Sequence, residues 1–124
     1  LTEEFWPGLL TLNLPQNKSL SWDLGDGGNL DNFAVRMPNR LETLEVVNET
    51  GPLAIASARF AGAPPITFVE NIHQLEALDI GELAAGPLST VVTLEGENLG
   101  VLRVGALTLE DLRNVVPTIE LANQ

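Results

Sequence analysis

The chain contains no cysteine, one lysine and one histidine, and each shortage excludes a class of function. Without cysteine it forms no disulfide, no thiolate metal site and no cysteine nucleophile. The single histidine, His73, lies in a predicted helix beside Glu70 and Glu76, a pattern more typical of a solvated helix face than of a metal site or a catalytic triad. Neither the Walker nor the Rossmann glycine spacing occurs. We therefore expect no resident metal site.

Positive charge is scarce, with six Lys and Arg residues against seventeen Asp and Glu and a net charge of −11. A surface that binds duplex nucleic acid needs several basic side chains facing phosphates, and the field around this chain repels polyanions. A nucleotide or an RNA would have to be held in a local pocket that overcomes this field.

Long apolar runs are also absent, and the longest are about the length of a strand, so no membrane span is predicted. Residues 1–4 carry no basic segment of the kind that opens a secretory signal, and we expect a cytoplasmic protein. With 124 residues, 44% of them hydrophobic, residues 1–124 are expected to form a single domain with a packed core.

The order of predicted elements favours an α/β sheet covered by helices. Apolar residues alternate or cluster as strands do, at 10–14, 33–37, 52–56, 89–94 and 99–104, with a weaker strand at 118–121 and a helix end before Pro7-Gly8. Three helices are predicted where a capping side chain precedes an acid by three residues, at Asn39/Glu42, Thr67/Glu70 and Thr108/Asp111.

Three arginines, Arg36, Arg59 and Arg103, lie at the edges of predicted apolar strands and are expected to be half-buried. A buried guanidinium is costly unless it is paired or given an anion. Either the three share one anionic ligand or each pairs with its own carboxylate, and for any one alone pairing is the commoner case. Ser57 and Ser89 stand at strand ends nearby, and hydroxyls beside arginine suit phosphoryl oxygens.

Six short blocks follow one another along the chain: FWPGLLTL at 5–12, AVRMP at 34–38, GPLA at 51–54, Ser57-Ala58, STVV at 89–92 and LRVGA at 102–106. Together these blocks resemble the YrdC/YciO family, whose best-known members are threonylcarbamoyl-AMP synthases. The resemblance extends from residue 5 to about residue 115 and rests on the order and spacing of the blocks. It implies a twisted mixed β-sheet flanked by helices, around a positively lined concave pocket.

The resemblance also implies a reaction. Members of the family condense threonine, bicarbonate and ATP into threonylcarbamoyl-adenylate with release of pyrophosphate, for a modification of an adenosine in tRNA. By resemblance, Arg36 holds the threonine carboxylate or bicarbonate and Ser57 contacts phosphate, so both count as candidate catalytic residues. Ser57, Arg59, Ser89 and Arg103 are the candidate ATP-binding residues, and magnesium is expected to arrive with ATP.

The chain departs from the family pattern at several positions. The family opens with a further segment bearing a Lys-x-Arg pair and another lysine, and this sequence begins after that point, so we expect the amino-terminal part of the domain to be lacking. The Ser-x-Asn motif is Ser57-Ala58-Arg59, where Arg59 would replace a missing cation only in part. Ala61, Pro65 and Leu88 stand where the family has serines and a glutamate. Each change removes a group that phosphoryl chemistry uses.

Three functions follow from this comparison of motifs. The first is a shortened or impaired member that still binds ATP or a related anion. The second is a catalytically inactive paralogue that acts through protein contacts, and the third is an RNA-binding module, which the net charge of −11 disfavours. A sheet cut in mid-domain exposes an edge, so we expect either self-association or pairing with a missing segment.

Overall fold

The computed structural model describes residues 1–17, 19, 31–55 and 86–123. Two compact units are present, one made of Leu1–Pro52 with Pro87–Gln124 and the other of Leu53–Gly86. Ser57, Arg59, His73 and the predicted helix after Thr67 lie outside the described residues.

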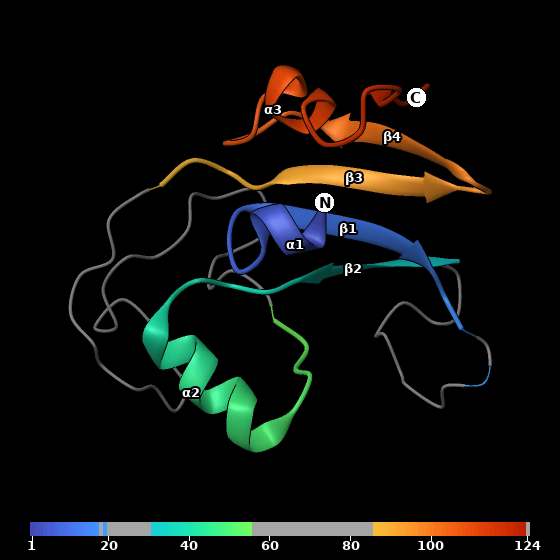
Figure 1. Ribbon diagram of the computed structural model, residues 1–124. Coiled ribbons are helices and arrows are strands. Elements are labelled where there is room, and N and C mark those ends of the chain that lie inside the picture. Colours follow the sequence, from blue (N-terminus) through green and yellow to red (C-terminus); the bar gives the residue numbers. More distant parts are fainter. Residues whose placement is uncertain (18, 20–30, 56–85, 124) are drawn as a thin grey trace, which may run out of the picture. The chain divides into compact units, whose positions relative to one another are not determined.

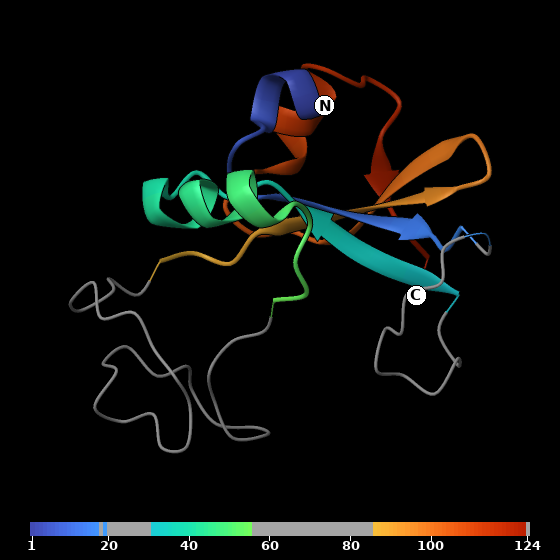
Figure 2. The same ribbon diagram turned by 90° about the horizontal axis from the view of Figure 1, so that it is seen from below.

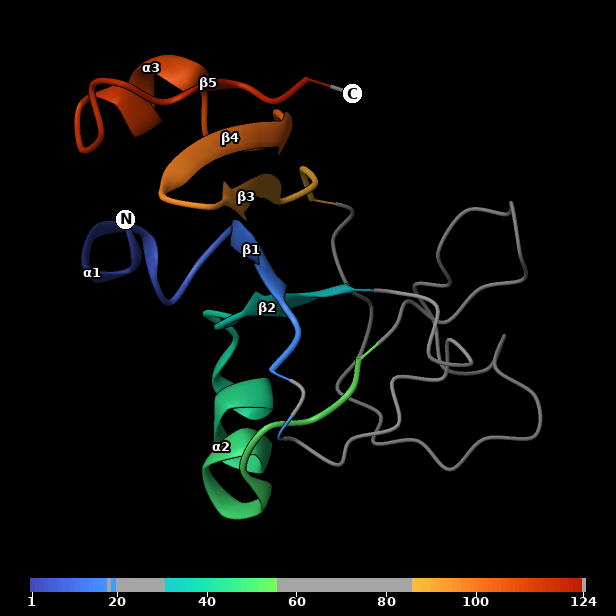
Figure 3. The same cartoon turned by 90° about the vertical axis from the view of Figure 1, so that its right-hand side faces the viewer.

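A five-stranded mixed sheet organises the first unit, in the order β2-β1-β3-β4-β5. Figure 1 shows β2, β1, β3 and β4 next to one another, and Figure 3 also labels β5. Strand β1 is antiparallel to β2 and parallel to β3, β3 is antiparallel to β4, and β4 is parallel to β5. The predicted α/β class with a mixed sheet is confirmed. The strands are β1 Leu10–Pro15, β2 Asn32–Arg36, β3 Thr90–Glu95, β4 Asn98–Arg103 and β5 Glu120–Leu121.

Helices α1 (Thr2–Phe5), α2 (Leu41–Thr50) and α3 (Leu109–Arg113) complete the described elements. The capping box predicted for α3 is confirmed, because the Asp111 N–H donates to Thr108 Oγ1 and the Thr108 N–H donates to Asp111 Oδ2. The predicted Asn39 cap is wrong, since α2 begins after Arg40 and has no side-chain cap. No helix in the described ranges is long and apolar enough to cross a bilayer.

The core lies on one face of the sheet. Leu10, Val92 and Val101 project from β1, β3 and β4, and Leu112 and Ile119 pack against them, all at most 2% exposed. Helices α1 and α3 both lie on this face of the sheet, as Figures 2 and 3 show. The alternation of apolar residues along β1 therefore directs every second side chain into the core.

The β3–β4 hairpin has the predicted position and turns at Gly96, whose φ of 64° lies in the left-handed region that glycine favours. The strand predicted at 52–56 is wrong over residues 52–55, which are irregular, and residue 56 lies outside the described part. Leu53 is 49% exposed and Ile55 is 68% exposed. An apolar run becomes a strand only where a neighbouring strand pairs with it, and residues 52–55 have no such neighbour among the described strands.

Candidate functional site

Four side chains from four neighbouring segments line up on the face of the sheet opposite the core. We call Arg36, Thr11, Ser89 and Arg103 the arginine–hydroxyl row. Thr11 lies opposite Arg36 in the β1–β2 ladder. Val91 lies opposite Thr11 on one side and Arg103 on the other, and Ser89 precedes it by two residues. Residues paired across a sheet share a face, so the row crosses four adjacent segments.

Arg103 holds the start of β3. Its Nε and Nη2 donate to the carbonyl oxygen of Ser89 at 3.2 and 2.9 Å, and Nη2 also donates to Ser89 Oγ at 3.2 Å. These acceptors are neutral, so the guanidinium charge is not cancelled by them. The contacts place that charge directly beside the Ser89 hydroxyl.

Arg36 holds the opposite end of the row. Its Nε donates to the carbonyl oxygen of Gly8 at 2.8 Å, and the Gly8 N–H donates to Met37 O at 2.8 Å. The end of β2 is thereby tied to the turn before β1. The two terminal nitrogens of Arg36 have no hydrogen-bond partner in the described part of the chain.

Neither arginine of the row pairs with a carboxylate within the described residues. The ion pair found there joins Arg40 to Glu42 at 3.3 Å, at the start of α2, and involves no residue of the row. The expected half-burial is wrong, because Arg36 and Arg103 are both exposed. Each is the last residue of its strand, where the sheet ends and a long side chain reaches water.

A bond between two hydroxyls joins the middle of the row. Thr11 Oγ1 and Ser89 Oγ lie 2.7 Å apart, and either atom can be the donor. Ser89 is 9% exposed, whereas Thr11 is half-buried. Sequence reasoning missed Thr11. The alternation along residues 10–14 did place it opposite the leucines, but no local spacing pairs it with a residue 78 positions away.

A buried threonine next to the row fixes the loop that follows β4. Thr90 is fully buried, and its Oγ1 accepts from the N–H groups of Gly105 and Leu107 at 2.8 and 3.0 Å and donates to Leu107 O at 2.6 Å. Gly105 packs so closely that a Cβ there would lie 2.6 Å from Ser89 O. This loop follows Arg103 directly, so its attachment helps to hold the guanidinium over Ser89.

The chemistry of the row suits an anion. It offers guanidinium and hydroxyl donors and contains no carboxylate, the ligand that a divalent cation prefers. Within the described ranges no group of three or more His, Cys, Asp and Glu side chains gathers as a metal site would. Arg36, Ser89 and Arg103, all predicted as site residues, lie in the row, while Ser57 and Arg59 fall outside the described part.

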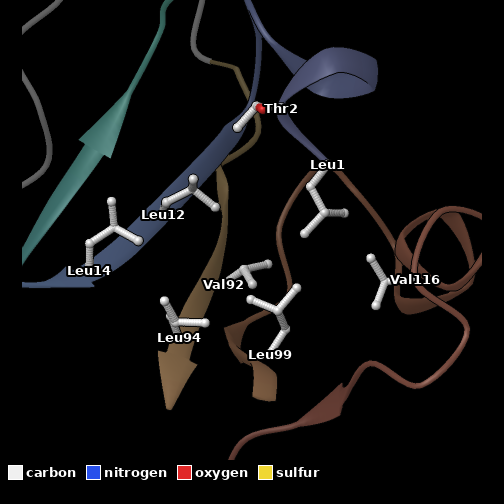
Figure 4. A pocket seen from close by; sticks show the side chains of 8 residues that line it. All are labelled: Leu1, Thr2, Leu12, Leu14, Val92, Leu94, Leu99 and Val116. Carbon is white, nitrogen blue, oxygen red and sulfur yellow. The ribbon is translucent and has the colours of Figure 1, made fainter. Parts of the chain in front are cut away.

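An apolar pocket of about 230 Å³ lies on the opposite face of the sheet (Figure 4). Thr2 supplies its one hydroxyl, and none of the predicted site residues lines it. It therefore lacks the donors that an anion needs. Its apolar lining consists of Leu1, Leu12, Leu14, Val92, Leu94, Leu99 and Val116.

Known proteins resemble the chain over almost all of its length. A protein of Mycobacterium tuberculosis is 36% identical over 122 residues, which are 94% of this chain and 55% of that protein. The threonylcarbamoyl-AMP synthase of Bacillus subtilis is 34% identical over 98% of this chain and 37% of its own length. The chain thus spans about half, or less, of these relatives.

Solved structures agree with the sequence matches. The Sua5 protein of Pyrococcus abyssi, in a crystal structure with L-threonine, superposes with a TM-score of 0.80 at 34% identity, over 98% of this chain and 37% of that one. Residues 1–105 match the profile of the Sua5/YciO/YrdC family, which carries the description "telomere recombination". The chain therefore belongs to the Sua5/YciO/YrdC family.

Proposed function

We propose that this chain supplies part of a threonylcarbamoyl-AMP synthase site, in which the arginine–hydroxyl row binds the oxyanions of the substrates. The observation that carries the proposal is the row itself, with two exposed arginines on one face and two hydroxyls between them. In the described residues no carboxylate neutralises either guanidinium. Two uncompensated cations beside hydroxyl donors complement a bound carboxylate or phosphate.

Arg36 is suited to a planar carboxylate. Its Nε donates to Gly8 O, which fixes the position of the guanidinium and leaves its two terminal nitrogens to bind a ligand. Two parallel N–H groups bind a carboxylate in a bidentate manner, which fixes orientation as well as charge. We propose threonine or bicarbonate as the ligand of Arg36, and the crystal structure of the Pyrococcus relative with L-threonine supports this class.

Arg103 and Ser89 are suited to a phosphate. Nε and Nη2 of Arg103 both donate to Ser89 O, so Arg103 has fewer N–H groups left for a ligand than Arg36 has. Its contribution to binding is therefore mainly its positive charge. We propose that this end of the row binds the phosphates of ATP, with Ser57 and Arg59 as further contacts. Magnesium carried in with ATP would neutralise charge on the phosphoryl oxygens.

The extent of activity is part of the proposal. Because the chain spans 55% of its mycobacterial relative and 37% of the Bacillus one, we propose that a complete site draws on groups beyond those matched. We therefore propose that the chain alone binds its ligands but makes little adenylate. A cationic side chain positioned at the transferring phosphoryl group stabilises the transition state by several kcal/mol. A site that lacks such side chains therefore turns over more slowly by orders of magnitude.

Isothermal titration calorimetry tests the proposal. The chain is titrated with MgATP and with L-threonine, and Arg36→Ala and Arg103→Ala are each compared with wild type. We expect Arg36→Ala to weaken threonine binding and Arg103→Ala to weaken ATP binding, each about tenfold or more, because each removes a charge-assisted contact.

Arg113→Ala is the matched control. Arg113 is another exposed arginine whose Nε donates to a backbone carbonyl, that of Ile119 at 3.2 Å, but it lies in α3 and off the row. Its loss should change neither affinity. Absence of binding by wild type at millimolar ligand, or equal effects of all three substitutions, would contradict the proposal.

A further inference from the structure

The hydrogen bonds of the two hydroxyls in the row leave one proton uncommitted. A serine or threonine hydroxyl has one proton to donate and two lone pairs to accept. The bond between Thr11 Oγ1 and Ser89 Oγ uses one of the two protons, whichever atom donates. Ser89 Oγ also accepts from Arg103 Nη2. No described acceptor takes the second hydroxyl proton.

The electrostatic surroundings of that proton favour donation to an anion. Arg103 donates to Ser89 Oγ, and such a bond polarises the hydroxyl pair toward donating onward. Thr11 lies opposite Arg36, about 4.8 Å away across the ladder at the backbone. Backbone to backbone, Arg36 and Arg103 are roughly 14 Å apart across three strand spacings, a gap that two long side chains and one small anion can fill.

We infer that Thr11 is a further ligand-binding residue. Together with Ser89 it forms a hydroxyl pair that donates one hydrogen bond to an oxyanion held between the two arginines. This inference rests on the proposed function, since it concerns the same row. The oxyanion could be the carboxylate of threonine or a phosphate of ATP, because both carry a charged oxygen. Separate titrations with L-threonine and with MgATP distinguish the two.

The test is Thr11→Val, which keeps the β-branched shape and the preference for a strand but removes the hydroxyl. The chain is titrated separately with L-threonine and with MgATP. We expect the affinity for the ligand that uses the pair to fall about tenfold, as for the loss of a hydrogen bond to a charged group. Thr11→Ser keeps the hydroxyl and should bind within about twofold of wild type.

A double-mutant cycle with Ser89→Ala distinguishes a pair from two separate contacts. If the two hydroxyls deliver one donor, then Thr11→Val with Ser89→Ala together should weaken binding little more than either alone. If the two hydroxyls made independent contacts, the fold-losses in affinity of the single variants would multiply in the double variant. That result would contradict the inference that the hydroxyls act as a pair. Thermal unfolding of each variant confirms that it is folded, and Thr11→Ala gives the same deletion should the valine variant fail to fold.

Thr93→Val is the control for removing a hydroxyl from this face of the sheet. Thr93 is 3% exposed and bonds to Asn13 two residues further along the strands, off the row. Its removal should leave both affinities unchanged. If Thr11→Val binds as wild type while Arg36→Ala does not, the inference falls and the proposed function stands. If wild type binds neither ligand, both fall.

Discussion

The two faces of the sheet differ in their side chains: one packs the core and the other carries the arginine–hydroxyl row. Consecutive residues of β1 show this difference. Leu10 is fully buried in the core, while its neighbour Thr11 points to the other face and bonds to Ser89. The core face is apolar and covered by α1 and α3. The row face carries hydroxyls and guanidinium groups. Stability and ligand binding should therefore be separable by substitutions one residue apart.

Leu10→Ala should give the largest effect, and it acts on stability alone. Leu10 is fully buried in the core cluster with Val92 and Val101, so truncation leaves a cavity. We expect the free energy of unfolding to fall by about 2–5 kcal/mol, measured by urea denaturation. Ligand affinity of the folded fraction should stay at the wild-type value. A matching loss of affinity would show that the two faces are coupled.

Gly105→Ala should affect both stability and binding, because the Gly105 N–H donates to the buried Thr90 while its backbone lies against Ser89 of the row. A Cβ there would collide with the backbone of Leu88 and Ser89, which cannot yield as a flexible side chain would. We expect a loss of about 1–3 kcal/mol in unfolding free energy. Because the collision displaces the residue that Arg103 holds, ATP affinity should fall as well, as calorimetry would show.

Gly86→Ala provides the comparison for that substitution. A Cβ at Gly86 meets nothing described within 4 Å, and its φ is not in the left-handed region. Both stability and affinity should stay close to wild type. If Gly105→Ala behaved like Gly86→Ala, the close approach of the loop to Ser89 would have no role in holding the row.

Arg36→Lys should have a smaller effect, mainly on binding. Lysine keeps the charge but loses the planar fork that offers two parallel donors. Arg36 is exposed and paired with no described carboxylate, so the variant should lose stability only through the bond from Nε to Gly8 O, about 1 kcal/mol or less. Threonine affinity should fall about tenfold, measured by calorimetry. Unchanged affinity would mean that charge alone matters there.

The sequence predicted the core face well because its signals are local. The alternation along residues 10–14 lies within a single strand, and the Thr108–Asp111 spacing lies within a single helical turn. The strand and the capping box that they predict are both confirmed. The predictions at Asn39 and at 52–56 failed because local spacing does not decide them: whether a side chain caps a helix or an apolar run forms a strand depends on what the segment packs against. A short apolar run with no pairing neighbour stays irregular.

The row could be predicted only in part, for a physical reason. Arg36 and Arg103 stand out as rare cations at strand ends, and motif order identified Ser89. Their half-burial was wrong because strand ends open to water. Thr11 was missed because the bond that brings it beside Ser89 joins parallel strands separated by a long connection. Register between distant strands is set by the whole sheet and not by neighbouring residues.

The smallest expected effect concerns pH and the helix that covers the core face. The hydroxyl and N–H of Thr108 donate to Asp111 at 2.7 and 2.8 Å, and these bonds hold the pKa of Asp111 below its ordinary value of 3.8. A lowered pKa in the folded state means that the unfolded chain takes up the proton first as pH falls. The stabilisation is therefore complete above pH 3.8 and is lost as pH falls through the lower, folded-state pKa.

Asp111→Asn isolates this contribution, because all other acids titrate equally in both chains. The difference in unfolding free energy between wild type and the variant should be constant from pH 7 to 5. It should shrink below pH 3.8, where the Asp111 carboxylate of unfolded wild type takes up a proton while that of folded wild type is still charged. Urea denaturation at pH 7, 5, 3.5 and 2.5 measures it. A difference that stayed constant to the lowest pH would mean that the cap stabilises α3 through geometry alone, without the charge on Asp111.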